Sequence, residues 1–263
     1  MGAKPYIGVT GPAYLAEVWN TVSAFQESDY NMNSQHIPMI GFLASFKTLN
    51  GELTENRRYP RFDQIRSLIE QVDHRAIAMI HYNSRVQDSL EEQVGRIFKN
   101  LYPDNLCRAI QLNIVWPEIE QVRRIKERFP EMQIVFQASR AAMADKTPQE
   151  IVAGIKKYGE TIDYVLIDPS GGRGLEFNLD NSLALYRELR ERTPRLTVGF
   201  AGGFTGENVE SRAKDMISRL GSSDFCIDAE GCLRDKLSDK YGDDLLNLNK
   251  VIGYLKNTSK AIR

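Results

Sequence analysis

Hydrophobic and polar positions follow two different rhythms in this chain, and the rhythm changes repeatedly from one end to the other. Short runs rich in Val, Ile and aromatic residues predict buried strands. We expect strands at residues 6–11, 37–45, 75–83, 107–114, 132–139, 163–168, 196–201 and 224–228.

Between these runs, apolar residues recur at the helical period, as at Ile119 and Val122. One helix start is well marked, because Thr147 would cap it, Pro148 would fill its first position and Glu150 would complete a capping box. The predicted helices cover residues 13–26, 61–71, 88–101, 117–129, 148–158, 179–192, 206–220 and 243–255.

The alternation of strands and helices predicts βα units around a parallel sheet. About eight strands are the number that closes a barrel of this kind. We therefore expect an α/β fold, a (β/α)8 TIM barrel that forms a single domain over residues 1–263.

Amino-acid composition excludes some classes of function but adds little about the fold. The 34 Lys and Arg nearly balance the 35 Asp and Glu, so the chain lacks the basic footprint of a nucleic-acid binder. No apolar run is long enough to cross a bilayer, and Cys107, Cys226 and Cys232 form no CxxC pair. We expect a cytoplasmic protein whose partner is a small molecule, with no nucleic-acid or membrane partner.

In a closed barrel the interior is filled by side chains, so reactive groups must project from the strand C-termini and the loops that follow them. Asp168 ends the sixth predicted strand and opens a glycine-rich loop, in which Ser170, Gly172 and Arg173 are candidate ligand contacts. Such glycines permit close backbone approach to a ligand. An ordinary Asp-Pro turn is the alternative interpretation.

The seventh and eighth strands end in a second group of candidates. Gly202 and Gly203 precede a predicted helix start near residue 206, where bare amides would form an anion site. Gly231 could add an amide to the same anion, but Glu230 would oppose it. Alternatively, Asp228 and Glu230 share acid and base duties, one raising the pKa of the other.

Neutral polar residues end the third, fourth and fifth strands and would suit the hydroxyls of a polar ligand. They are His81, Asn83, Gln111, Asn113 and Gln137. His81 is a candidate acid or base, although a lone His is more often structural. Arg58, in the long irregular segment 46–60, is a further substrate-binding candidate. No ligand spacing indicates a metal, and we expect no cofactor.

Taken together, the strand ends resemble phosphoribosylanthranilate isomerases, a family of ribulose-phosphate-binding barrels. Leu166-Ile167-Asp168 is similar to the family's strand-six aspartate, and the run from Ala201 to Val209 is similar to its Ala-Gly-Gly-Leu-Thr-Pro-Glu-Asn-Val. Weaker likenesses are Gly8-Val9-Thr10, Gly41-Phe42, Asn56-Arg57-Arg58-Tyr59 and Ile110-Gln111-Leu112-Asn113.

The resemblance implies that Asp168 is the general acid that opens the sugar ring. The family's strand-one cysteine, its general base, is replaced by Ile7 or Gly8 according to the alignment. Its Ser-Ser-Gly phosphate loop appears as Ala229-Glu230-Gly231, and a carboxylate is costly beside a phosphate. Either the ligand lacks that phosphate or Glu230 points elsewhere.

Three functions follow as hypotheses for a monomer or homodimer. The first is an isomerase of a ribosyl or sugar (phosphate) compound, with Asp168 as acid and Glu230, Asp228 or His81 as base. The second is a hydrolase of an N-glycosidic or ribosyl bond that uses Asp168 and Glu230 as paired carboxylates. The third is a non-catalytic binding barrel.

Overall fold

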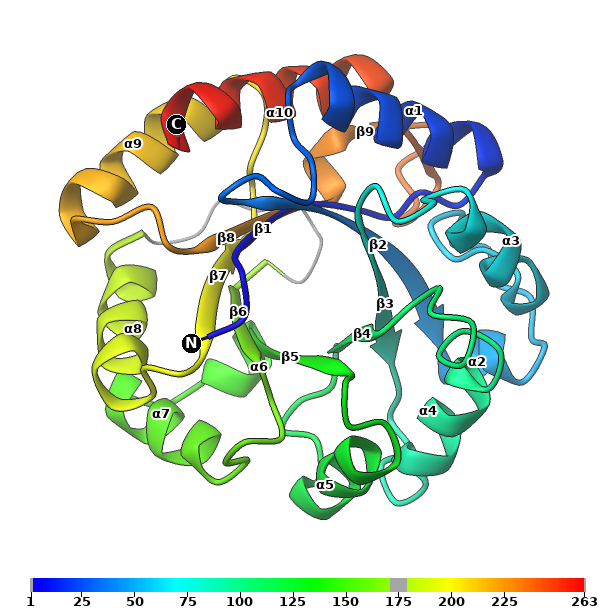
Figure 1. The fold of residues 1–263 in the computed structure, drawn as a ribbon, viewed down its shortest axis with the longest axis horizontal. Coiled ribbons are helices and arrows are strands. Elements are labelled where there is room, and N and C mark those ends of the chain that lie inside the picture. The colour runs from blue at the N-terminus through cyan, green and yellow to red at the C-terminus, as the bar shows by residue number, and fades with distance from the viewer. Residues whose placement is uncertain (1, 171–178, 263) are drawn as a thin grey trace.

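In the computed structural model, which describes residues 2–170 and 179–262, eight parallel strands close into a barrel, β8 pairing back to β1 (Figure 1). The strands are β1 (Tyr6–Thr10), β2 (Ile37–Ser45), β3 (Ile77–Asn83), β4 (Ala109–Leu112), β5 (Gln133–Ser139), β6 (Tyr164–Asp168), β7 (Thr197–Ala201) and β8 (Cys226–Ala229). The predicted (β/α)8 TIM barrel is confirmed, with each strand inside the predicted range or within one residue of it.

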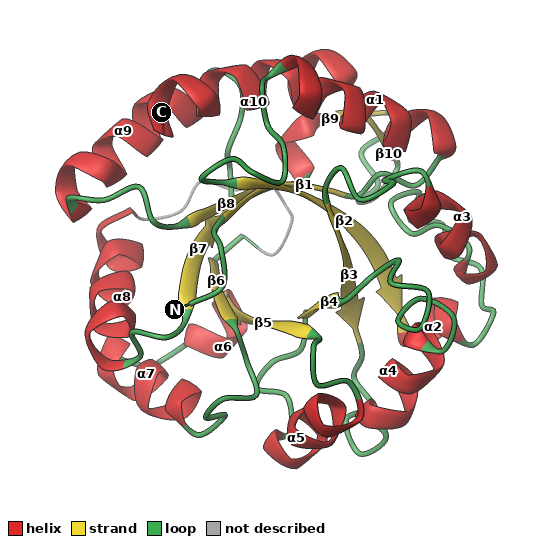
Figure 2. Cartoon of the chain, in the orientation of Figure 1, coloured by secondary structure: helices red, strands yellow, loops and turns green. Residues whose placement is uncertain are grey.

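Helices surround the barrel, as Figure 2 shows in red. They are α1 (Leu15–Glu27), α2 (Phe46–Leu49), α3 (Ile65–Glu70), α4 (Leu90–Phe98), α5 (Ile119–Arg128), α6 (Arg140–Met143), α7 (Pro148–Lys156), α8 (Leu179–Arg192), α9 (Val209–Leu220) and α10 (Leu248–Ile262). The capping box at Thr147 and Glu150 is present at the start of α7, as predicted. No helix within the described residues is long and apolar enough to span a bilayer.

The final predicted helix, 243–255, starts too early. Residues Asp244–Leu246 form a strand, β10, which pairs antiparallel with β9 (Arg234–Lys236) to make a hairpin between β8 and α10. The strand forms because the Asp244 carboxylate is bound by two arginines and the Leu246 amide donates to Glu17. A short 3-10 helix, η2 (Gly231–Leu233), joins β8 to this hairpin. Another, η1 (Phe62–Gln64), precedes α3.

Strand alternation sorts the side chains into two packed layers. The larger layer lies between the strands and the helices and includes Ile7, Ile80 and Ile227. The smaller layer fills the barrel axis with Tyr6, Met39, Met79, Val135, Tyr164 and Cys226. Two residues further along β3, β5 and β8 the inward positions are polar, at His81, Gln137 and Asp228, and four residues further along β6 the position is Asp168. The barrel is therefore plugged at its N-terminal end and open to chemistry at its C-terminal end.

Candidate active site

A cavity of about 330 Å³ opens among the C-terminal strand ends and the loops that follow them. Twelve of the residues predicted from the sequence line it, namely His81, Asn83, Gln111, Asn113, Gln137, Asp168, Ser170, Gly202, Gly203, Asp228, Glu230 and Gly231. Arg58 lies behind the wall and contacts Glu230. The remaining two candidates, Gly172 and Arg173, lie outside the described residues.

Asp168, at the end of β6, is buried and held from two sides. The side-chain amide of Gln137, on the neighbouring strand, donates to its Oδ2 at 2.7 Å. The amide and hydroxyl of Ser170 both donate to its Oδ1, at 3.0 and 2.9 Å. These donors fix the carboxylate at the cavity wall, with an orientation set by two strands and the first residues of the following loop.

Asp228 differs from Asp168 in its depth and in its partners. It lies one residue before the end of β8, whereas Asp168 is the last residue of β6, and the Thr10 hydroxyl donates to its carboxylate at 3.0 Å. Burial raises the pKa of Asp228 to about 8, the Thr10 hydrogen bond opposes this, and the charges of Glu230 and Asp168 reinforce it. At neutral pH this carboxyl therefore carries a proton.

Gly8 explains why the Asp228 carboxyl can stand where it does. A Cβ placed on Gly8 would lie 2.5 Å from Oδ1 of Asp228. The acidic group of β8 therefore occupies the space that a side chain on β1 would need. This is the strand on which the resemblance left the general base missing, because Ile7 points outward into the apolar layer.

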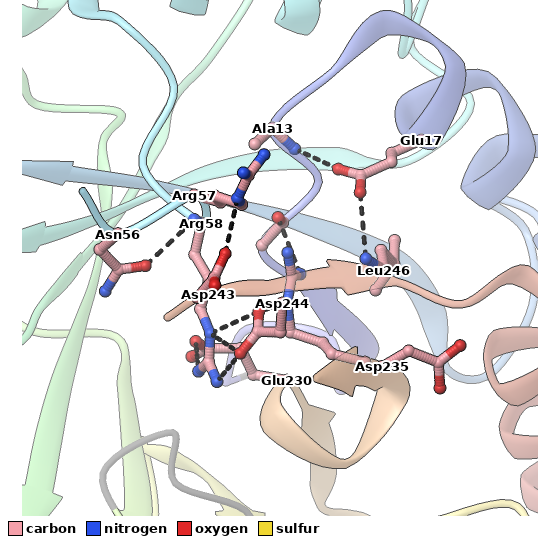
Figure 3. Close-up of polar contacts among 12 residues, drawn as sticks. Ala13, Glu17, Asn56, Arg57, Arg58, Glu230, Asp235, Asp243, Asp244 and Leu246 are labelled. Carbon is pink, nitrogen blue, oxygen red and sulfur yellow. Dashed lines mark hydrogen bonds and ion pairs between the residues drawn. The ribbon is translucent and has the colours of Figure 1, made fainter. Parts of the chain in front are cut away.

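Glu230 forms a partly buried ion pair with Arg58, at 2.7 Å between Oε1 and Nη1 (Figure 3). The other guanidinium nitrogens of Arg58 bind Asp244, and Arg234 binds the same carboxylate at 2.5 Å. Burial raises the pKa of Glu230, and the charge and hydrogen bond of Arg58 oppose this rise. Arg58, which we predicted to contact the substrate, thus donates from these nitrogens to the carboxylates of Glu230 and Asp244.

Contacts around Arg58 tie the loop after β2 to the β9–β10 hairpin. Arg57 pairs with Asp243 at 2.7 Å, and its amide donates to the Gly242 carbonyl. The guanidinium of Arg58 lies 4.8 Å from the ring centroid of Tyr241, which lines the cavity. The residues joined by these ion pairs lie 186 positions apart in the sequence. Two distant segments therefore meet at this wall of the cavity.

On β3 and β4 the inward residues are neutral. His81 and Gln111 are register partners, so their side chains stand next to each other. Burial lowers the pKa of His81 to about 3, which leaves the imidazole uncharged at neutral pH. Gln111 donates from Nε2 to Asn113 at 2.7 Å, while its Oε1 and the Nε2 of His81 have no partner among the described residues.

The predicted anion site at the start of α9 differs from expectation. The helix begins at Val209 rather than near residue 206. In the turn before it, Thr205 and Asn208 hydrogen-bond to each other. The amide of Thr205 donates to the Asn208 side chain, and the amide of Asn208 donates to the Thr205 hydroxyl. Gly202 and Gly203 do line the cavity, with φ values of 114° and 64° that favour glycine.

Tyr59 and Tyr241 also line the cavity, and sequence reasoning missed both. Tyr59 follows Arg58 in the long loop, so its position beside a named candidate was a usable signal. Tyr241 gave none, because its approach to the site depends on the unexpected hairpin. Within residues 2–170 and 179–262, no three His, Cys, Asp or Glu side chains group closely enough to hold a metal ion.

No protein-family model matches the chain, and no curated protein matches it in sequence. Solved structures match it over nearly its full length. A phosphoribosyl anthranilate isomerase from Thermotoga maritima is 15% identical with a TM-score of 0.60, covering 97% of this chain and 98% of that one. TrpF from Jonesia denitrificans is 17% identical with a TM-score of 0.58, covering 97% and 96%.

A third match is tryptophan synthase subunit alpha from Legionella pneumophila str. Paris, which is 11% identical with a TM-score of 0.59, covering 98% of this chain and 92% of that one. The chain therefore has the barrel fold of the phosphoribosyl anthranilate isomerases that its strand-end motifs resemble. At these identities the likeness shows the fold, and function must be argued from the site.

Proposed function

We propose that this protein is an acid–base enzyme that isomerises a small sugar or ribosyl compound. The observation that carries the proposal is the pairing, in one cavity, of a buried protonated carboxyl, Asp228, with a fixed carboxylate, Asp168. A proton donor and a second carboxyl group held by hydrogen bonds in the same cavity are what acid–base catalysis needs. The isomerases among the structural matches support the reaction class by analogy of fold.

The raised pKa of Asp228 assigns the roles. Isomerisation of an aldose-type sugar requires a proton for the ring oxygen and a base for the proton on C2. Asp228 carries a proton at neutral pH, so it protonates the ring oxygen and is reprotonated by the C1 hydroxyl as the ring opens. Asp168 then takes the proton from C2 and returns it to C1, while the O2 hydroxyl proton moves to O1. This reverses the role that the resemblance implies for Asp168. His81, the other candidate base, is uncharged at neutral pH because burial lowers its pKa to about 3.

The alternatives have less support. Hydrolysis by Asp168 with Glu230 requires Glu230 to exchange protons, but Arg58 holds that carboxylate at 2.7 Å. A non-catalytic barrel would have no use for a buried acid whose pKa is near 8, since burying such a group costs stability.

The test is an assay of ribosides, amino sugars and ribose phosphates, followed by NMR for an altered sugar or a released base. Asp168→Asn and Asp228→Asn should each lower turnover by about 10²–10⁴-fold, because each removes one proton-transfer group. Asp63→Asn, an equal change at an exposed site, is the matched control. Release of the base without an altered sugar would move the assignment to hydrolysis, and ligand binding with full activity in both variants would refute the proposed roles.

A further inference from the structure

The imidazole of His81 lines the cavity without a hydrogen-bonding role inside the described part of the protein. The residue lies on β3 and is only 2% exposed, and its Nε2 has no partner among residues 2–170 and 179–262. No charge or hydrogen bond from those residues contributes to its lowered pKa, which burial alone accounts for. Burying a polar group without a partner costs stability, and a ligand that hydrogen-bonds the ring would offset this cost.

Gln111, the neighbour of His81 on β4, is buried in the same way. The two residues are register partners, so their side chains project side by side. Gln111 is also 2% exposed, and while its Nε2 donates to Asn113, its Oε1 has no partner in the same residue ranges. A neutral imidazole can donate or accept a hydrogen bond, whereas an amide oxygen only accepts. The pair therefore suits two neighbouring oxygen atoms of a ligand, at least one of them a hydroxyl.

Gly41 leaves the space that brings His81 near the partner of Asp228. A Cβ on Gly41 would lie 2.7 Å from His81 Nε2 and 2.5 Å from the Thr10 hydroxyl, which donates to Asp228. His81 and the Thr10 hydroxyl thus approach the same point inside the barrel. In the proposed reaction Asp228 serves the ring oxygen and the C1 hydroxyl, so the C1 end of the sugar lies on the side of His81.

We infer that His81 is a further catalytic residue of the proposed isomerisation, which carries the O2 proton to O1 while Gln111 orients the O2 hydroxyl. The imidazole N–H gives its proton to O1 as C2 loses its own proton, and the same nitrogen then takes the proton of O2. When the carbon-bound proton returns to C1, O1 is a hydroxyl, O2 is the carbonyl oxygen and the ring is neutral again. The inference rests on the proposed function, which requires this transfer between the two oxygens.

A neutral ring suits this step because it adds no charge to the resting cavity. The burial that disfavours an imidazolium also strengthens the N–H hydrogen bond to an oxygen that is gaining negative charge. A donor that is already in place where this charge develops lowers the barrier without reorganisation.

Binding of an intermediate mimic tests the contact without requiring turnover. D-erythronohydroxamic acid holds two adjacent oxygens in the planar arrangement of O1 and O2 in a pentose enediolate. With ¹⁵N-labelled histidine, NMR resolves the ring nitrogens of the chain's three histidines. We expect the hydroxamate to move the His81 signals within the range of a neutral ring. His36 and His74, which precede β2 and β3 at the opposite end of the barrel, should stay unchanged.

Deuterium exchange tests the proton transfer itself. His81→Gln retains a hydrogen-bond donor, but an amide does not exchange protons as an acid or base. In D₂O, NMR would follow D-ribose and ribose 5-phosphate for deuterium that enters C2 and for ketose that forms. We expect ketose formation to fall by about 10²-fold or more, while exchange at C2 falls by less than about tenfold. A merely structural role would lower both equally, and His74→Gln, the same change at an exposed site, should alter neither.

Unmoved His81 signals in the presence of the hydroxamate would overturn the inference. So would an equal fall of exchange and ketose formation in His81→Gln, or no fall at all. The proposed function fails on different evidence, namely release of a base without an altered sugar, or full activity in Asp168→Asn and Asp228→Asn. An isomerase that needs both aspartates but loses exchange and turnover together in His81→Gln would refute the inference alone.

Discussion

The two sides of the cavity are built from the same strand geometry but differ in charge. One side, the acidic arc, consists of Asp168 on β6, Asp228 on β8 and Glu230 just after β8. The other, the neutral arc, consists of His81 and Gln111 on β3 and β4 with Asn83 and Asn113 at their ends. Burial acts on both, yet it has opposite consequences for their ionisable groups.

In the acidic arc, burial keeps a proton on Asp228, whose pKa is about 8. In the neutral arc, burial keeps a proton off His81, whose pKa is about 3. Both groups are therefore uncharged at pH 7, and the charge that remains on Glu230 is matched by Arg58. In both arcs, burial is the largest cause of the pKa shifts of Asp228 and His81. The ion pairs of Arg58 instead lie where the loop after β2 meets the β9–β10 hairpin.

The largest effect on this comparison should come from removing the ion pairs behind the acidic arc. Arg58→Met leaves Glu230 without its cation and Asp244 with Arg234 alone. We expect it to lower the free energy of unfolding by about 3–5 kcal/mol, as for a broken buried ion pair. Urea denaturation measures this.

Arg61→Met is the matched control, since Arg61 is exposed and, among residues 2–170 and 179–262, its side chain pairs only with that of the exposed Asp63. It should change stability by less than about 0.5 kcal/mol. If Arg58→Met cost no more than Arg61→Met, the acidic arc would not depend on this cluster. Adding Glu230→Gln to Arg58→Met should restore part of the lost stability.

The next effect is a difference in pH dependence between the arcs. Folded Asp228 keeps its proton up to about pH 8, while the unfolded residue loses it near pH 4. Its contribution to stability is therefore present at low pH and lost as pH rises from about 4 to 8, at up to about 1.4 kcal/mol per pH unit. His81 in the folded protein stays unprotonated down to about pH 3. Its contribution to the free energy of unfolding is therefore present above the unfolded pKa near 6.5 and is lost as pH falls from there.

Unfolding free energies at pH 4, 5, 6.5 and 8 would measure both slopes. Asp228→Asn should flatten the decline toward pH 8, and His81→Gln should flatten the decline toward pH 4. Other carboxylates, such as Asp244, whose pKa burial raises but its two arginines lower on balance, add a background that the difference between variants removes. Identical slopes in all three proteins would contradict the assigned protonation states.

The smallest effect should appear at Gly41, where the two arcs meet. A Cβ there would lie 2.5 Å from the Thr10 hydroxyl, the partner of Asp228, and 2.7 Å from Nε2 of His81. We expect Gly41→Ala to destabilise the protein by about 1–3 kcal/mol through overpacking. Gly253→Ala, in α10 with space around it, should be neutral or stabilising by up to about 1 kcal/mol. Thermal unfolding of both variants would show whether their signs differ as expected.

Local pattern determined the barrel and most of the rim. Runs of apolar residues gave all eight strands, and the rule that barrel chemistry lies at strand C-termini selected Asp168, Asp228, His81 and Gln111, which do line one cavity. These predictions worked because alternation along a strand fixes which side chains point inward. The same reasoning failed at Asp244, where the helical pattern of residues 243–255 hid a strand held by two arginines from elsewhere.

What the tertiary structure decided was the state of each group once it was inside. The sequence presented Arg58 as a ligand contact and left open where Glu230 points, and the fold joined the two across 172 residues. It also placed the Asp228 carboxyl against Gly8, in the space of the missing strand-one side chain. Strand periodicity is a local property of the chain, whereas desolvation and ion pairing depend on which distant segments close over a group.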